Sequence, residues 1–223
     1  LFAYLLWSMV YEGKEMVGQL SFHAMLSYYI ISSFLAQLEK SGGISSEIHE
    51  RIRNGTFSKY MVIPVQIQKY FMAMELGVVL FYAAFDFIAA VIWIFVFRIR
   101  FVFAADIRLV VCAVIMAMFG MIFMVQLNYF LGLLTLKYQG IGTFLMVKNH
   151  LEALVTGSIV PLMLFPEIIV KMMQLLPFYY VTYLPSMLLI GMCGEEAMTG
   201  IMAIACWCLI MQLLIRAVGQ KYF

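Results

Sequence analysis

Long stretches of nearly unbroken apolar residues are the feature that most constrains this chain. The longest of them, 67–97, contains only Lys69, Glu75 and Asp86 as charged residues. A helix needs about 20 mostly apolar residues to cross the hydrocarbon core of a bilayer. A membrane β-strand would alternate apolar and polar residues, whereas these stretches are apolar on every side. Hydrophobic residues make up 65% of the chain, against about 45–50% in soluble domains, so we predict an all-α integral membrane protein.

Polar breaks divide these stretches into six expected transmembrane helices. We place them at residues 1–10, 21–38, 67–97, 107–136, 145–165 and 199–215. The first is too short to cross alone, so we expect a truncated first span. Residues 167–191 are long enough to cross but contain Pro177 and Pro185, and a proline inside a helix removes a backbone donor and clashes with the preceding turn. We therefore predict a re-entrant helical hairpin there, made of two short helices.

A polar segment, 39–66, separates the second and third predicted spans. Ser46 is a favoured N-cap and Gly55 a favoured helix stop, which predicts a helix over 46–54. Isoleucines recur every fourth residue and form one apolar stripe opposite the charged side chains: Ile44, Ile48 and Ile52. So short a helix is marginal alone in water. The stripe must therefore either rest on lipid headgroups or fit the groove of a cytoplasmic partner.

The distribution of Lys and Arg sets the expected orientation. If the polar segment faces the cytoplasm, nine of the fourteen Lys and Arg residues lie on that side. The positive-inside rule favours this arrangement, although Arg98 and Arg100 lie on the other side and argue against it. The hairpin at 167–191 would then be extracellular. The C-terminus would be cytoplasmic.

Proline and small-residue landmarks follow one another in a fixed order near the end of the chain. They are Gly157-Ser158, Pro161-Leu162, Phe165-Pro166, Leu176-Pro177-Phe178, and Pro185 to Gly191. The polar segment adds an ordered set of its own: Ile48, Ile52, Gly55, Phe57, Met61 and Pro64. Together with the basic ending IRAVGQKYF, these landmarks resemble the ABC-2-type permease family, the membrane subunits of type-2 ABC exporters. The resemblance covers nearly the whole chain as one transmembrane domain, 1–223, and departs at the start, where the family has an elbow helix and a complete first span.

The resemblance implies a role for the polar segment and for the proline landmarks. In the family, the cytoplasmic loop is a coupling helix that docks on an ATPase subunit, its charged face toward the ATPase and its apolar stripe on the permease. The residues that would couple are Ile48, Glu50, Arg51, Ile52, Arg53, Gly55 and Phe57. The residues that would form an extracellular gate are Pro161, Phe165, Pro166, Pro177, Phe178 and Pro185.

Catalytic motifs are missing from the sequence. It contains no GxxxxGK[ST] phosphate loop, the motif that cradles nucleotide phosphates. The three histidines lie far apart without an HExxH metal motif. We expect no enzyme activity, cofactor or metal in this chain, with ATP and Mg²⁺ on the partner ATPase.

Two carboxylates within the third predicted span are candidates for a substrate pathway. Glu75 and Asp86 are eleven residues apart, which returns to nearly the same helical angle about 16 Å along the axis, and Tyr82 falls on the same stripe. Charged groups at membrane depth are costly and usually face protein or water. The stripe either lines a path for cationic or amphipathic cargo or faces a neighbouring helix or a partner permease. Met121 either belongs to an adaptable cargo surface or only packs.

The expected function is that of a permease subunit of an ATP-driven ABC exporter. It would dimerise with itself or a related permease, bind two copies of an ABC ATPase, and move an amphipathic drug, peptide or lipid-like substrate out of the cell. We expect a multi-pass protein of a bacterial plasma membrane, with no nucleic-acid partner. The alternative is an ATPase-independent channel or ion-coupled carrier that uses the intramembrane carboxylates. A third reading is a sensory or immunity protein that binds peptide without moving it.

Overall fold

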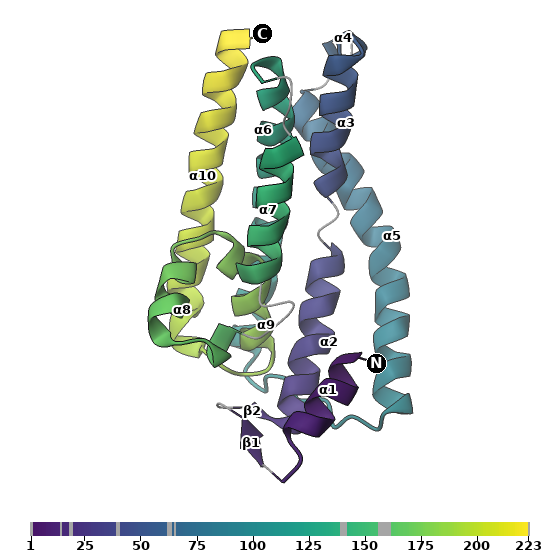
Figure 1. The fold of residues 1–223 in the computed structure, drawn as a ribbon, viewed down its shortest axis with the longest axis vertical. Coiled ribbons are helices and arrows are strands. Elements are labelled where there is room, and N and C mark those ends of the chain that lie inside the picture. The colour runs from purple at the N-terminus through teal and green to yellow at the C-terminus, as the bar shows by residue number, and fades with distance from the viewer. Residues whose placement is uncertain are drawn as a thin grey trace.

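Long helices dominate the fold of this chain (Figure 1). The computed structural model describes residues 2–13, 15–17, 20–38, 41–61, 64, 66–138, 142–155 and 162–222. Among these residues, three helical stretches are long and apolar enough to cross a membrane: Ile67–Val96, Ile107–Leu136 and Gly194–Gln220. The first corresponds to α5 (Ile67–Val96). The second consists of α6 (Ile107–Leu133) and the 3₁₀ turn η1 (Leu134–Leu136) that follows it. The third includes most of α10 (Ala197–Tyr222). The all-α membrane architecture is thereby confirmed, and these stretches match the third, fourth and sixth predicted spans.

The other predicted spans are shorter helices. They are α1 (Phe2–Val10), α2 (Phe22–Leu38) and α7 (Gly142–Val155). A two-stranded hairpin, β1 (Met16–Val17) and β2 (Leu20–Ser21), connects α1 to α2, with Met16 opposite Ser21. The predicted fifth span extends past α7 into residues 156–161, which lie outside the described residues. The count of six spans therefore stays a prediction.

The polar segment folds as predicted but begins earlier. It forms α3 (Gly42–Arg53) and the short α4 (Ser58–Met61). Ser41 and not Ser46 is the N-terminal cap residue, so the prediction for the helix start was wrong by five residues. The predicted stop is confirmed, since Gly55 has a φ of +69°, a backbone conformation that glycine adopts without steric cost.

The proline-containing segment forms several short pieces in place of one long helix. After the 3₁₀ turn η2 (Leu162–Leu164) come α8 (Glu167–Gln174), the π-helical turn η3 (Tyr179–Tyr183), α9 (Leu184–Leu189) and the 3₁₀ turn η4 (Gly194–Glu196). Pro177 lies between α8 and η3, and Pro185 lies in the first turn of α9. The predicted interruption is confirmed at Pro177, but the prediction for Pro185 was wrong, because η3 continues directly into α9 and only the helix type changes there. Whether the segment enters the membrane and returns stays a prediction.

Helix α6 lies at the centre of the bundle and joins its two hydrophobic clusters. The larger cluster packs α6 against α2, α9, η3 and α10, and includes Met25, Met116, Phe123, Leu184 and Ile204. The smaller cluster packs α6 against α3 and α5, at the end of the molecule that also holds α4 and the C-terminus (Figure 1). In contrast, α5 exposes many large apolar side chains, as a helix against lipid does.

Candidate functional site

Helix α3 lies in a close-fitting seat on α6. Ile44 and Ile48 are buried, and Ile52 packs at the edge of the same cluster. Opposite them α6 carries Gly132, where a Cβ atom would lie 2.8 Å from the Ile48 Cβ. A side chain at position 132 would therefore separate the helices. The isoleucine stripe thus rests on the protein's own helix, as the resemblance to the ABC-2-type permease family implied, and not on lipid headgroups or in a partner's groove.

Two polar contacts fix the position of α3 along α6. Asn128 Nδ2, within α6, donates hydrogen bonds to Ser41 Oγ at 2.8 Å and to the Met124 carbonyl at 3.0 Å. About two turns of α3 further on, His49 Nδ1 lies 3.1 Å from Thr135 Oγ1. Asn128 is completely buried, and hydrogen bonds between buried polar groups are costly to break. These contacts hold α3 in one register.

A charged cluster joins α3 to α4. One oxygen of Glu47, Oε1, accepts hydrogen bonds from Arg51 Nε and Nη2 at 3.1 and 3.0 Å and from the Tyr60 hydroxyl at 2.7 Å. The Arg51 guanidinium also lies 5.0 Å from the centre of the Tyr60 ring. Burial, followed by the bond to Glu47 and its negative charge, raises the pKa of the Tyr60 phenol. Tyr60 therefore stays a protonated donor at neutral pH, and the turn between α3 and α4 is held in place.

The predicted coupling residues divide into an inner and an outer group. Ile48 and Phe57 are buried, at 0% and 5% exposure, so they shape the seat and are not accessible to another protein. Ile52 and Arg51 are half-buried. The exposed members are Glu50, Arg53 and Gly55. The accessible surface of α3 is thus a ridge of positive and negative side chains at its C-terminal end, and its apolar face is buried beneath this ridge.

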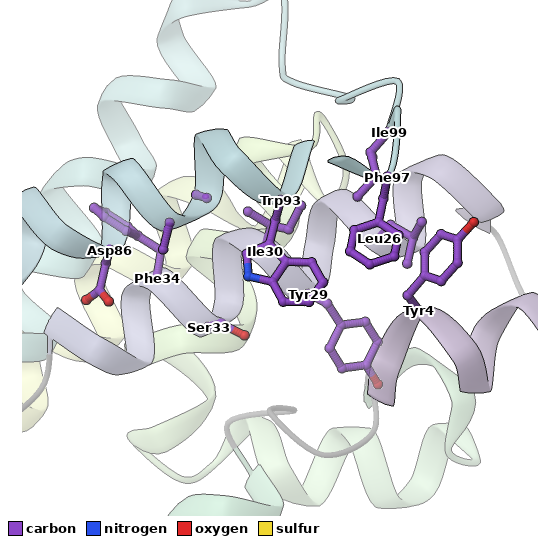
Figure 2. Close-up of a pocket in the computed structure, with 12 residues that line it drawn as sticks. Tyr4, Leu26, Tyr29, Ile30, Ser33, Phe34, Asp86, Trp93, Phe97 and Ile99 are labelled. Atoms are coloured by element: carbon purple, nitrogen blue, oxygen red, sulfur yellow. The ribbon is translucent and has the colours of Figure 1, made fainter. Parts of the chain in front are cut away.

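The candidate pathway residues do not form one cluster. Glu75 is buried at 6% exposure, Tyr82 is exposed at 43%, and Met121 is half-buried on α6. Asp86 lines a cavity of about 340 Å³ with residues of α1, α2 and α5 (Figure 2). Glu75, Tyr82 and Asp86 therefore have different surroundings, and their common role in a substrate pathway stays a prediction.

The candidate gate residues lie beside α6 and α10. Pro177 and Phe178 are buried, and the Phe178 ring meets Phe123 of α6 edge-on at 6.3 Å between centres. Phe165 is half-buried and Pro166 precedes α8. Pro185 is buried in α9, and Pro161 lies outside the described residues. The turn η3 also has a close-fitting seat on α6, because a Cβ atom at Gly120 of α6 would lie 3.1 Å from the Val181 Cα.

The whole chain, residues 1–223, matches the family model described as "ABC-2 family transporter protein". The chain belongs to the ABC-2 transporter family. No curated protein and no solved structure matches it. As an ABC-2 membrane subunit, this permease works with a separate ABC ATPase and is not itself the ATPase. The resemblance seen in the order of its landmarks is confirmed.

Sequence reasoning missed a glutamine cluster that links the permease's three long helices. Gln212 Oε1 of α10 accepts hydrogen bonds from Gln68 Nε2 of α5 at 2.9 Å and from Gln126 Nε2 of α6 at 3.1 Å. Gln212 Nε2 donates back to Gln68 Oε1 at 3.3 Å. The signal was one glutamine within each of three apolar stretches. A polar side chain at such positions needs a partner, but the sequence does not say which.

Replacing the shared acceptor should loosen this permease. In Gln212→Leu, the Gln68 and Gln126 amides lose their common partner, and each buried polar group left unsatisfied costs about 1–3 kcal/mol. We expect a clear fall in the thermal unfolding temperature of the detergent-solubilised protein. Gln220→Leu, an exposed glutamine near the end of the same helix, is the control and should unfold as the unaltered protein does. Equal unfolding temperatures for both variants would mean that the cluster contributes nothing.

Proposed function

We propose that this chain is the permease of an ATP-driven ABC exporter that moves an amphipathic drug, peptide or lipid-like substrate out of a bacterial cell. Two permease chains, identical or related, would assemble with two ATPase subunits. The observation that carries the proposal is a short helix with an exposed charged ridge, seated by its apolar face on a membrane helix. The end of the molecule that carries α3, α4 and the C-terminus (Figure 1) would face the cytoplasm.

The proposed route from ATPase to gate runs along α6. A force applied to α3 would pass through the contact of Ile48 with Gly132. Helix α6 also touches η3 and α9 of the proline-containing segment, which would form the extracellular gate. ATP binding would then shift the population between inward-facing and outward-facing states, since a ligand shifts an equilibrium by its difference in affinity for the two states.

Reversing the charge of Arg53 should disrupt the complex. Arg53 is exposed at the end of α3, so Arg53→Glu changes the proposed docking ridge without disturbing the packing beneath it. We expect affinity purification of the tagged permease from its native membranes to recover the ATPase in stoichiometric amounts. The Arg53→Glu variant should recover roughly tenfold less, as expected when a charged interface contact worth a little over 1 kcal/mol is lost.

The control reverses one exposed positive charge elsewhere, with Lys171→Glu in α8. This variant should recover the ATPase as the unaltered protein does. Recovery of ATPase with Arg53→Glu at the unaltered level would show that α3 is not the docking element.

An ATPase-independent carrier is the second candidate, favoured by Asp86, whose Oδ2 is buried with no hydrogen-bond partner among the described residues. A permease that purifies alone and moves solute across liposome membranes without ATP would support the carrier. It would also end the exporter proposal.

A further inference from the structure

A cavity between α1, α2 and α5 combines one acidic group with aromatic walls. Its volume is about 340 Å³, at the small end of the range of small-molecule sites. Figure 2 shows Asp86 at one end and Tyr4 at the other, with Trp93 and Tyr29 between them. Among the described residues that line it, none is Lys, Arg or His. The cavity therefore contains one acidic side chain and, among these residues, no basic one.

One oxygen of the Asp86 carboxylate lacks the hydrogen-bond partner that a buried carboxylate oxygen normally has. Its Oδ2 is buried and has no hydrogen-bond partner among the described residues. The residue lies ten positions before the end of α5 at Val96, or about 15 Å along the axis, well within the membrane span. A carboxylate at that depth costs several kcal/mol unless something compensates its charge. A bound cation would supply that compensation.

The walls of the cavity suit a flat, positively charged ring. The Trp93 and Phe97 rings are stacked, 4.7 Å between centres and 6° between planes, and the Tyr4 ring lies 4.6 Å from Phe97. Trp93 follows Asp86 by seven residues, so both lie on one face of α5 about 10 Å apart. Tryptophan offers the strongest cation–π face among the side chains. One end of the cavity would hold a charge and the other an aromatic body.

The charge balance limits the ligand further. One carboxylate compensates one positive charge, and a dication would carry a second charge into an apolar site, where unpaired charges are costly. An anion would be repelled by Asp86, because none of the described residues that line the cavity is a cation. A neutral aromatic molecule would leave Asp86 uncompensated.

We propose that this cavity is a binding site for small aromatic monocations, in which Asp86 compensates the charge and Trp93 stacks on the ring. The proposal names a substrate class for the proposed exporter. Only the transport of these compounds, and not their binding, rests on the exporter function. Binding itself requires neither ATP nor an ATPase. The site would be loaded from the membrane, because its residues Ala89 and Trp93 lie within the predicted span α5 and are exposed.

The test is equilibrium binding of ethidium, a planar aromatic monocation, to the full chain in phosphatidylcholine nanodiscs. Binding is followed by fluorescence anisotropy, without nucleotide. Asp86→Asn should raise the Kd at least about tenfold, because the charge compensation is lost while the shape is kept. Asp106→Asn removes the same charge at the exposed N-cap of α6, where Asn is an equally good cap, and should leave the Kd unchanged.

Two further measurements distinguish a loss of ethidium binding from a loss of folding. The neutral 6-phenylphenanthridine, which shares the ring system, should bind weakly and equally to the unaltered chain and to Asp86→Asn. Ala90→Phe keeps Asp86 but fills the cavity, and should abolish binding of both compounds with unaltered thermal stability.

Ethidium binding that is unchanged by Asp86→Asn would overturn the proposal, as would tight binding of the neutral compound. No ethidium binding to the unaltered chain would also overturn it, for example because a positive group of a second copy fills the cavity. Failure to recover an ATPase on affinity purification would instead refute the exporter function and leave the binding result standing.

Discussion

Gly132→Val should detach α3 from α6. The new Cβ would lie 2.8 Å from the Ile48 Cβ and 3.0 Å from its Cγ2, and neither atom is the far end of a flexible side chain. Overpacking of this kind costs about 1–3 kcal/mol, and a cost of about 2 kcal/mol corresponds to about 30-fold in an equilibrium constant. We expect substrate-stimulated ATP hydrolysis by the purified permease–ATPase complex to fall by about that factor.

Gly77→Val in α5 is the control, which separates the effect of packing from the effect of helix propensity. Nothing lies within 4 Å of a Cβ at Gly77, and glycine in a helix interior costs about 1 kcal/mol relative to alanine. Intrinsic propensity would therefore favour both substitutions, so only the contact with Ile48 makes Gly132→Val harmful. If both variants hydrolyse ATP at the unaltered rate, α3 does not transmit force through this contact.

Gly120→Leu should disable the opposite end of α6. A Cβ there would lie 3.1 Å from the Val181 Cα and 3.5 Å from its carbonyl oxygen, so the obstacle is backbone, which moves less readily than a side chain. We expect η3 to shift and ATP-dependent uptake of a fluorescent substrate into inverted vesicles, which corresponds to export from the cell, to fall by roughly tenfold or more, for a strain of about 1–3 kcal/mol. Because α3 is untouched, the ATPase should still co-purify in full.

The matched variant is Gly219→Leu in α10, where nothing lies within 4 Å of a Cβ. It should export at the unaltered rate. Loss of ATPase recovery in Gly120→Leu would mean that the substitution disturbs the whole bundle and not the gate segment. Unaltered export would mean that η3 has no part in the gate.

The sequence predicted α3 well because its signals are local. Isoleucines at a spacing of four residues indicate a helix face whatever the surroundings. Its start was mistaken because Gly42 and Gly43 indicate a loop and Ser46 is an ideal cap, whereas Asn128 of α6 binds Ser41 and supports an extra turn. That contact spans 87 residues of chain, and tertiary packing overrode local propensity.

The glutamine cluster and the cavity depend on neighbours that no local pattern reveals. Gln68 and Gln212 are 144 residues apart and meet only because α5 and α10 both pack beside α6. Asp86 was singled out from the sequence as an intramembrane charge. Its aromatic neighbours Tyr4 and Tyr29 come from α1 and α2, and the sequence carries no signal that these helices line α5 there.

The seats at Gly120 and Gly132 lie on one uninterrupted helix, since α6 contains no proline. Proline, the commonest cause of a sharp helix kink, is therefore missing between the two seats, which are twelve residues or about 18 Å apart. The consequence is pharmacological. In the proposed orientation, a compound that wedges between α3 and α6 would act from the cytoplasmic side, so it would have to enter the cell to inhibit an opening about 18 Å further along α6.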